Sequence, residues 1–197
     1  MNDVHLSRRS RSATSAGVKL DRQQIVNAAL ALADDAGLDA LNMRALAGRM
    51  GVQASALYWH IDSKDRLLAM MAGEFYRRAF SAAPQDGDWR AWLRAFGHGF
   101  RKELLAHPYS ARLCAAARPV EANVTDAADR TAAPLVALGL AKETALACQA
   151  SVLSLTLGWV LYEQSDTMHD HLAEMVGFDR SYAFGLDALV AGFPTPK

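Results

Sequence analysis

Polar, aromatic and small side chains alternate within one short segment, residues 53–60, which reads Gln-Ala-Ser-Ala-Leu-Tyr-Trp-His. Gln53 and Ser55 carry short polar groups that could reach base edges in a DNA groove, and the alanines between them would let a helix approach the duplex. Tyr58 and Lys64 carry a hydroxyl and an ammonium group, which suit contacts with phosphate oxygens. The segment therefore indicates nucleic-acid binding.

The same residues have an ordinary structural interpretation. Tyr58 and Trp59 could belong to a hydrophobic core, and a single histidine such as His60 is more often structural than functional. Both interpretations stay open on composition alone. Under the first, Arg44, at the start of the preceding predicted helix, could reach the edge of a groove.

A helix-turn-helix is predicted around this segment. A first helix begins after Asp21, which can form a capping box with Gln24, and it stops at Gly37. A second, short helix begins after Asn42 and ends at Gly51, and the segment described above forms the third. Apolar residues recur at helical spacing in the first two helices: Ile25, Ala28, Ala29, Leu32, Met43, Leu46, Ala47 and Met50. Two short helices joined by a tight glycine turn after a longer helix are typical of this motif.

The rest of the chain is predicted to be helical as well. Asp62 or Ser63 caps a longer helix, a turn-rich linker follows it, and Asp88 caps the next helix. The remaining predicted helices cover residues 110–117, 122–138, 142–164 and 182–191. Pro134 would kink or split the second of these, and residues 166–177 are polar and irregular. No alternation typical of strands occurs, so the expected fold class is all-α.

The composition excludes several classes of protein. Hydrophobic residues make up 51% of the chain, so it can bury a core, and its formal net charge of zero argues against a histone-like protein that coats DNA through bulk charge. Residues 1–80 nevertheless carry eleven Lys and Arg against eight Asp and Glu, which favours nucleic acid at the N-terminal end.

The expected compartment is the cytoplasm. The two cysteines form no CxxC motif, so neither a disulfide framework nor a structural zinc site is expected. The most apolar stretch, residues 151–162, is shorter than the about 20 residues that a bilayer-spanning helix needs. We therefore expect no membrane partner.

Residues 20–75 resemble the DNA-binding domain of the TetR family of bacterial transcriptional repressors. The resemblance rests on Met-Arg-Ala-Leu-Ala at 43–47, Gly-Val at 51–52 and Ala-Leu-Tyr-Trp-His at 56–60. The Leu-Tyr-Trp-His order is similar to the tetracycline repressor branch in particular. The similarity continues into the ligand-binding domain of that branch through residues 89–105, 117–119, 155–161 and 184–189.

The resemblance implies a set of residues that touch an operator. These are Arg44, Ala54, Ser55, Ala56, Tyr58, Trp59, His60 and Lys64, to which we add Gln53 for its polarity. The chain departs from the family where the third helix begins, since it has Ala-Ser-Ala at 54–56 in place of Gln-Pro-Thr, so base readout is expected to differ. Two recognition helices must lie about 34–36 Å apart to read successive major grooves. We therefore expect a homodimer that binds a palindromic double-stranded DNA operator.

Aromatic and polar residues in the C-terminal half have the composition of a small-molecule pocket. The residues expected to line it are Trp92, Phe96, Phe100, Cys114, Arg118, Pro119, Arg130, Trp159 and Tyr162. Each large apolar residue among them could instead belong to a plain core or to a dimer seam.

The resemblance also indicates what this pocket lacks. The tetracycline repressor branch holds a magnesium–drug chelate through a histidine and a glutamate, and the matching residues here are Cys114 and Tyr162, which suit magnesium poorly. The positions that anchor the drug are Phe96 and Arg130. We therefore expect no metal and no cofactor, and a small hydrophobic effector with an acid or a carbonyl that Arg118 could pair with.

The long helix and the last helix are expected to form a four-helix bundle across a dimer seam. The seam residues would be Ala147, Ser151, Ser154 and Gly158 on the long helix and Ala183, Leu186, Leu189 and Val190 on the last one. The expected domains are a flexible basic tail over residues 1–17, a helix-turn-helix domain over 18–66, and a ligand-binding and dimerisation domain over 67–197.

Three functions are compatible with this pattern. The first is a ligand-responsive transcriptional repressor, which an effector releases from its operator. The second is an architectural or sequence-specific DNA-binding protein without an effector. The third is an all-α enzyme with an incidental helix-turn-helix, which we do not expect because no nucleophile–base pair, phosphate loop or catalytic carboxylate cluster is found. His169 and His171 form only a weak metal-binding pattern.

Overall fold

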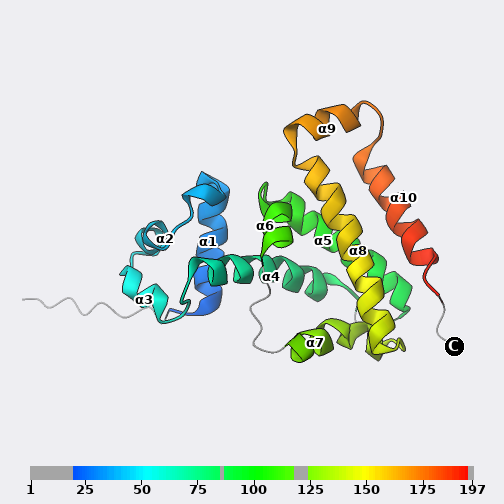
Figure 1. Ribbon diagram of the computed structural model, residues 1–197, viewed down its shortest axis with the longest axis horizontal. Helices are drawn as coiled ribbons and strands as arrows, with labels where there is room; N and C mark the ends of the chain where they lie inside the picture. Colours follow the sequence, from blue (N-terminus) through cyan, green and yellow to red (C-terminus); the bar gives the residue numbers. More distant parts are fainter. Residues whose placement is uncertain (1–19, 85–86, 118–123, 195–197) are drawn as a thin grey trace, which may run out of the picture.

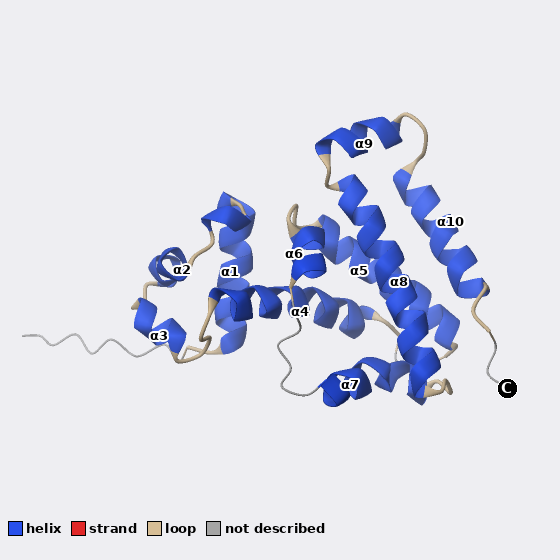
Figure 2. Ribbon diagram, viewed as in Figure 1, coloured by secondary structure: helices blue, strands red, loops and turns tan. Residues whose placement is uncertain are grey.

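The computed structural model describes residues 20–84, 87–117 and 124–194. Throughout these ranges the secondary structure consists of ten α-helices and one 3-10 turn, with no strand, as Figure 2 shows. The expected all-α class is confirmed. Figure 1 shows α1, α2 and α3 at one end of the molecule and the longer helices α5, α8 and α10 at the other, with α4 between them.

Helix α1, Arg22–Ala36, begins with the predicted capping box. The Asp21 carboxylate accepts a hydrogen bond from the Gln24 backbone N–H at 2.7 Å, and the Gln24 side chain accepts one from the Asp21 backbone N–H at 3.1 Å. The helix ends at Gly37, which adopts a φ of 83° that other residues rarely reach. A short 3-10 turn, η1, Leu38–Ala40, then leads to α2, and the sequence did not predict it.

Helix α2, Met43–Met50, is capped by Asn42 and ends at the left-handed Gly51, both as predicted. Helix α3, Ala54–Tyr58, is shorter than the predicted 53–60. It stops because the backbone N–H groups of His60 and Ile61 both donate to the Leu57 carbonyl at 2.9 Å, which turns the chain. The turn buries the Ile61 side chain in the core.

Helix α4, Lys64–Ala82, joins the two ends of the molecule. Ser63, and not Asp62, is its cap, because its hydroxyl accepts a hydrogen bond from the Arg66 backbone N–H at 3.2 Å. The helix packs against α1 of the helix-turn-helix and against α5 and α6 of the C-terminal region. A movement of α4 therefore affects both regions.

The C-terminal region contains six helices. They are α5 Trp89–Leu105, α6 Ser110–Ala116, α7 Val124–Ala137, α8 Lys142–Glu163, α9 Asp166–Ala173 and α10 Phe178–Ala191. Asp88 caps α5 as predicted, and α8 packs against α5, α7 and α10. Gly97 lets α10 approach α5 closely, since a Cβ there would lie 2.9 Å from Cδ2 of Leu186. The Tyr182 and Thr156 hydroxyls are 2.9 Å apart and join α10 to α8.

The sequence interpretation was wrong about two of these helices. Residues 166–173 form α9 where an irregular segment was predicted, and α10 begins at Phe178 rather than at residue 182. Helix α9 has eight residues and none of them is buried, so the few partly buried apolar residues, Met168 and Leu172, gave too short a pattern to predict it. Tertiary contacts extend α10: the Phe178 ring stacks on His169 with centroids 4.9 Å apart, and Asp179 accepts a hydrogen bond from Arg101 at 2.8 Å. Helix α7 contains Pro134 and is not split by it.

Helix α8 also corrects the expectation about membranes. With 22 residues it is long and apolar enough to cross a bilayer by length and composition, and it is the one helix of this kind in the described ranges. Length and composition do not separate a bilayer-spanning helix from the central helix of a bundle. Five helices, α5, α6, α7, α9 and α10, contact α8 here, and 33% of its apolar stretch is buried within the chain.

Candidate functional site

Helix α3 exposes the aromatic residues that follow its buried anchor. Leu57 is fully buried, whereas Tyr58 is 51% exposed and Trp59 is 89% exposed. The interpretation of Tyr58 and Trp59 as core aromatics is therefore wrong. Large exposed aromatic side chains on a well-anchored helix are typical of a binding surface.

The other predicted DNA-contacting residues lie around the same helix. Arg44, Gln53, Ser55 and Lys64 are exposed, and Ala54, Ala56 and His60 are half-buried. They come from the start of α2, from α3 and its ends, and from the start of α4, which follow one another at one end of the molecule (Figure 1). The structure thus brings together all nine residues that the sequence predicted for this surface.

A hydrogen bond from α1 helps to hold this surface in place. The Arg22 guanidinium donates through Nε to the His60 carbonyl at 3.3 Å, and so joins the start of the supporting helix to the segment after α3. Sequence reasoning missed this role of Arg22, because the two residues are 38 positions apart.

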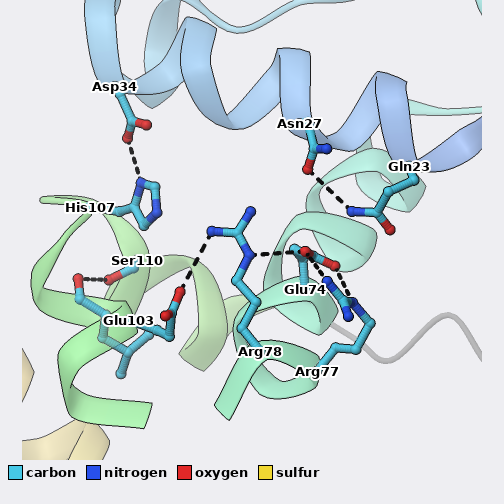
Figure 3. A network of polar contacts seen from close by, with 10 residues as sticks. Gln23, Asn27, Asp34, Glu74, Arg77, Arg78, Glu103, His107 and Ser110 are labelled. Atoms are coloured by element: carbon cyan, nitrogen blue, oxygen red, sulfur yellow. Dashed lines mark hydrogen bonds and ion pairs between the residues drawn. The ribbon is translucent and has the colours of Figure 1, made fainter. Parts of the chain in front are cut away.

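A buried carboxylate on α4 is the centre of an ion-pair network that the sequence did not predict (Figure 3). Glu74 accepts two hydrogen bonds from Arg77, at 2.7 and 2.6 Å, and one from Arg78 at 2.9 Å. Burial would raise the pKa of Glu74, but the hydrogen bonds from these two arginines outweigh it and lower the pKa to about 2. Arg78 also pairs with Glu103 of α5 at 3.5 Å.

Contacts between α1 and the α5–α6 segment form a junction between the two regions, which Figure 3 shows in part. Asp34 Oδ1 of α1 lies 2.7 Å from Nδ1 of His107, which follows α5. Close by, the Tyr109 hydroxyl donates to the Leu30 carbonyl at 3.1 Å. Burial first, and then the Asp34 carboxylate, raise the pKa of Tyr109, so the phenol stays a donor. We call these two cross-region bonds the junction.

An aromatic cluster from α4 and α5 fills the interior of the C-terminal region. Trp92 stacks on Phe96 with ring centroids 5.1 Å apart, and Phe80 meets both rings edge-on at 5.4 and 5.0 Å. Phe100 continues the stack 6.0 Å from Phe96, and Tyr76 stacks on Phe100 at 4.7 Å. Three predicted pocket residues, Trp92, Phe96 and Phe100, are thus brought together in one aromatic cluster.

The other predicted pocket residues differ in position. Cys114 is buried in α6 near Tyr76 of the aromatic cluster, and burial raises the pKa of its thiol to about 12. Trp159 is half-buried and meets Phe178 edge-on at 6.4 Å, while Tyr162 and Arg130 are exposed. Arg118 and Pro119 lie outside the described residues. Of the described residues in this set, Cys114 is thus the one that lies beside the aromatic cluster.

Metal-binding side chains do not cluster in the described part of the chain. No group of three or more His, Cys, Asp and Glu residues lies within reach of one ion there. His169 and His171 are exposed on α9, and the His169 ring stacks on Phe178. Burial raises the pKa of the Cys114 thiol, so in the metal-free protein this thiol is protonated at neutral pH.

The exposed face of α8 and α10 differs in part from the predicted dimer seam. Leu186 and Val190 are fully buried within this chain, so they supply no area to a partner. Phe184, which was not predicted, is 75% exposed on α10, and Tyr162 is 49% exposed on α8. The face that remains for a partner combines these aromatic rings with the small, exposed residues Ala147 and Ser154.

Comparison with known proteins places both regions in one family. Residues 25–71 match the family described as bacterial regulatory proteins, tetR family, and residues 81–175 match the tetracyclin repressor-like C-terminal domain. Tetracycline repressor protein class G of Vibrio anguillarum is 32% identical to this chain over 198 residues, which cover 89% of the chain and 94% of that relative.

Solved structures agree in fold with this chain. A variant of TetR from Acinetobacter baumannii AYE, in complex with minocycline, is similar with a TM-score of 0.70 and 35% identity, covering 89% of this chain and 97% of the other. BioQ with its double-stranded DNA operator is similar with a TM-score of 0.63 and 29% identity, covering 89% and 98%. With an anchored, aromatic-tipped recognition helix at one end and a tetracycline-repressor-like helical domain at the other, the chain belongs to the TetR family of bacterial transcriptional regulators.

Proposed function

We propose that this protein is a ligand-responsive transcriptional repressor that binds a palindromic operator as a homodimer and leaves it when a hydrophobic small molecule binds. The observation on which the proposal depends is the exposure of Tyr58 and Trp59 beside the fully buried Leu57. The buried leucine fixes the helix on the core, so the aromatic residues and their polar neighbours form a rigid surface for a duplex.

The exposed side chains divide into two roles. Gln53 and Ser55 lie where α3 begins and reach base edges, whereas Tyr58 and Lys64 contact phosphate oxygens. The first backbone N–H groups of α4, next to Lys64, add donors for a phosphate. The similarity to BioQ bound to its operator supports this arrangement.

The face formed by α8 and α10 is the proposed dimer interface. Its exposed aromatic residues, Phe184 and Tyr162, supply apolar area, and the small residues of α8 allow close helix packing. A dimer is required because two α3 helices must reach successive major grooves about 34–36 Å apart. The interface therefore sets the distance between the two α3 helices, which must match the spacing of the operator half-sites.

Helix α4 is the proposed link between effector and operator. Its C-terminal half contributes Tyr76 and Phe80 to the aromatic cluster, and its N-terminal end carries Lys64. A guest next to the aromatic cluster would displace α4 and so change the distance between the two α3 helices. The similarity to a TetR variant solved with minocycline supports a small molecule as the signal.

A mobility-shift assay with DNA that flanks the protein's own coding region tests this function. The expected result is a complex on an inverted repeat, which hydrophobic effectors dissociate and which a random duplex of equal length does not form. Equal affinity for both duplexes would favour the architectural alternative. A protein that stays monomeric and shifts neither duplex would overturn the proposal.

A further inference from the structure

Three buried polar atoms of the C-terminal region find no hydrogen-bond partner in the structure as described. They are Nε1 of Trp92 and both side-chain amide atoms, Oε1 and Nε2, of Gln149. Each of these two residues is 1% exposed, so solvent does not reach them from outside. Trp92 lies on α5 and Gln149 on α8, and these two helices pack against each other.

Other buried polar groups of the same region are well satisfied. The Gln164 amide nitrogen, at the end of α8, donates to the carbonyls of Leu104 and His107 at 2.9 Å each, and its oxygen accepts from the Ala111 backbone N–H at 3.3 Å. The buried Thr156 hydroxyl bonds to the Val152 carbonyl at 2.8 Å. A buried amide with no partner loses its hydration without a replacement, so Gln149 is an exception that calls for a ligand.

The surroundings of these atoms indicate the chemistry of that ligand. Trp92 belongs to the buried aromatic cluster, so a guest held by its indole N–H would lie among aromatic rings, which favours an aromatic guest. The described buried residues include one charged side chain, Glu74, and Arg77 and Arg78 already neutralise it. A charged guest would find no counter-ion among them, so a neutral guest is favoured.

We infer that the Trp92 indole N–H and the Gln149 amide are the hydrogen-bonding groups that hold the effector, and that this effector is a neutral planar aromatic compound with a carbonyl next to an N–H. The indole can only donate, which suits a carbonyl oxygen. The glutamine amide presents one donor and one acceptor, which match the edge of a lactam or an amide. This inference rests on the proposed function, because it names the ligand class of the same interior.

Two glutamine variants test whether the Gln149 amide lacks hydrogen-bond partners. Gln149→Met removes atoms without partners and keeps an unbranched side chain, so the melting temperature of the ligand-free protein stays equal or rises. Gln164→Met removes four hydrogen bonds, one of them to the Ser110 hydroxyl, and lowers the melting temperature. If Gln149→Met lowers it as much as Gln164→Met does, the amide is satisfied by buried water and the inference fails.

Calorimetric titration with two small aromatic compounds tests the ligand class. The probes are 2-quinolone, a planar neutral lactam, and naphthalene, which has a similar size and no polar atom. The full-length protein without DNA should bind 2-quinolone about tenfold more tightly than naphthalene, and Gln149→Met or Trp92→Phe should remove that preference. Absence of 2-quinolone binding, or an equal loss for both probes, would overturn the inference.

The two proposals fail separately. If no operator is bound while 2-quinolone binding still depends on Gln149, the proposed repressor function is wrong and the proposed ligand site is supported. If effectors release the operator, and Gln149→Met changes neither this release nor 2-quinolone binding, the proposed ligand site is wrong and the repressor function is supported.

Discussion

The helix-turn-helix and the interior of the C-terminal region use side chains in opposite ways. At the N-terminal end the functional groups, among them Tyr58 and Trp59, point into solvent from a short helix that Leu57 anchors. In the C-terminal region the candidate groups, Trp92 and Gln149, are enclosed and lack partners. The proposed DNA surface is thus exposed in a single chain, whereas three buried polar atoms of the interior lack hydrogen-bond partners.

This difference has a physical reason. A duplex is large and charged and binds to an outer surface, so its contacts cost the free protein little. A small hydrophobic molecule gains affinity by leaving water, so its site must be enclosed. In the ligand-free protein, the polar groups of such a site are removed from water without a partner, which costs free energy. Helix α4 contributes side chains to both regions. In the proposed function, its movement therefore couples effector binding in the C-terminal region to the position of α3.

Leu57→Ala should have the largest effect, because it removes the anchor of α3. The side chain is fully buried, so the expected loss is about 2–5 kcal/mol of unfolding free energy, together with operator binding. Denaturant titration and a mobility shift measure the two effects. The neighbouring Trp59→Ala should change stability by less than about 0.5 kcal/mol, since its ring is 89% exposed. Similar losses for both variants would contradict the separation of anchor from surface.

Glu74→Gln should lower the free energy of unfolding by about 2 kcal/mol, because Arg77 and Arg78 lose the carboxylate with which they pair on α4. The folded pKa of about 2 lies below the ordinary 4.5, so the carboxylate's contribution is present above pH 4.5 and is lost as the pH falls toward 2. Thermal unfolding of both proteins between neutral pH and pH 2 measures this. A difference between them that stays constant over the whole range would argue against the ion-pair network.

Tyr58→Ala should weaken operator binding about tenfold and leave the fold intact, because the ring is half exposed and we propose that its hydroxyl contacts a phosphate. Quantitative mobility shifts measure affinity, and circular dichroism checks the fold. Met175→Ala is the matched control, since it removes an exposed apolar side chain that belongs neither to the recognition surface nor to the proposed dimer interface. Unaltered affinity in Tyr58→Ala would show that α3 does not dock as described.

Asp34→Asn should lower the unfolding free energy by less than about 1 kcal/mol, because it weakens one partly exposed bond of the junction. Its effect should appear in the response to effector, since α1 would follow the C-terminal region less closely. Asp35→Asn is the matched control: Asp35 pairs with Arg49 at 2.7 Å inside the helix-turn-helix and does not cross the junction. Effector titrations of the operator complex compare the two variants, and identical curves would remove the junction from the mechanism.

Local signals in the sequence predicted most of the helices. Asp21, Asn42 and Asp88 cap the helices that were expected to follow them, and Gly37 and Gly51 end the first two. Caps act within three or four residues, so the sequence holds all that is needed to predict them. The same locality explains why the nine candidate DNA-contacting residues lie at one end of the molecule, since they belong to consecutive elements.

Tertiary packing decided what the sequence left open. The burial of Leu186, the exposure of Phe184 and the isolation of the Gln149 amide depend on which helices meet, and residues far apart in the chain determine that. Helix α9 spans only eight residues and buries none of them, so its apolar pattern was too short to predict a helix. The sequence alone determined the helix-turn-helix and its aromatic tip, because short-range hydrogen bonds and spacing specify them. Only the assembled bundle determined which side chains of the C-terminal region are enclosed, because enclosure is a property of neighbouring helices and not of one.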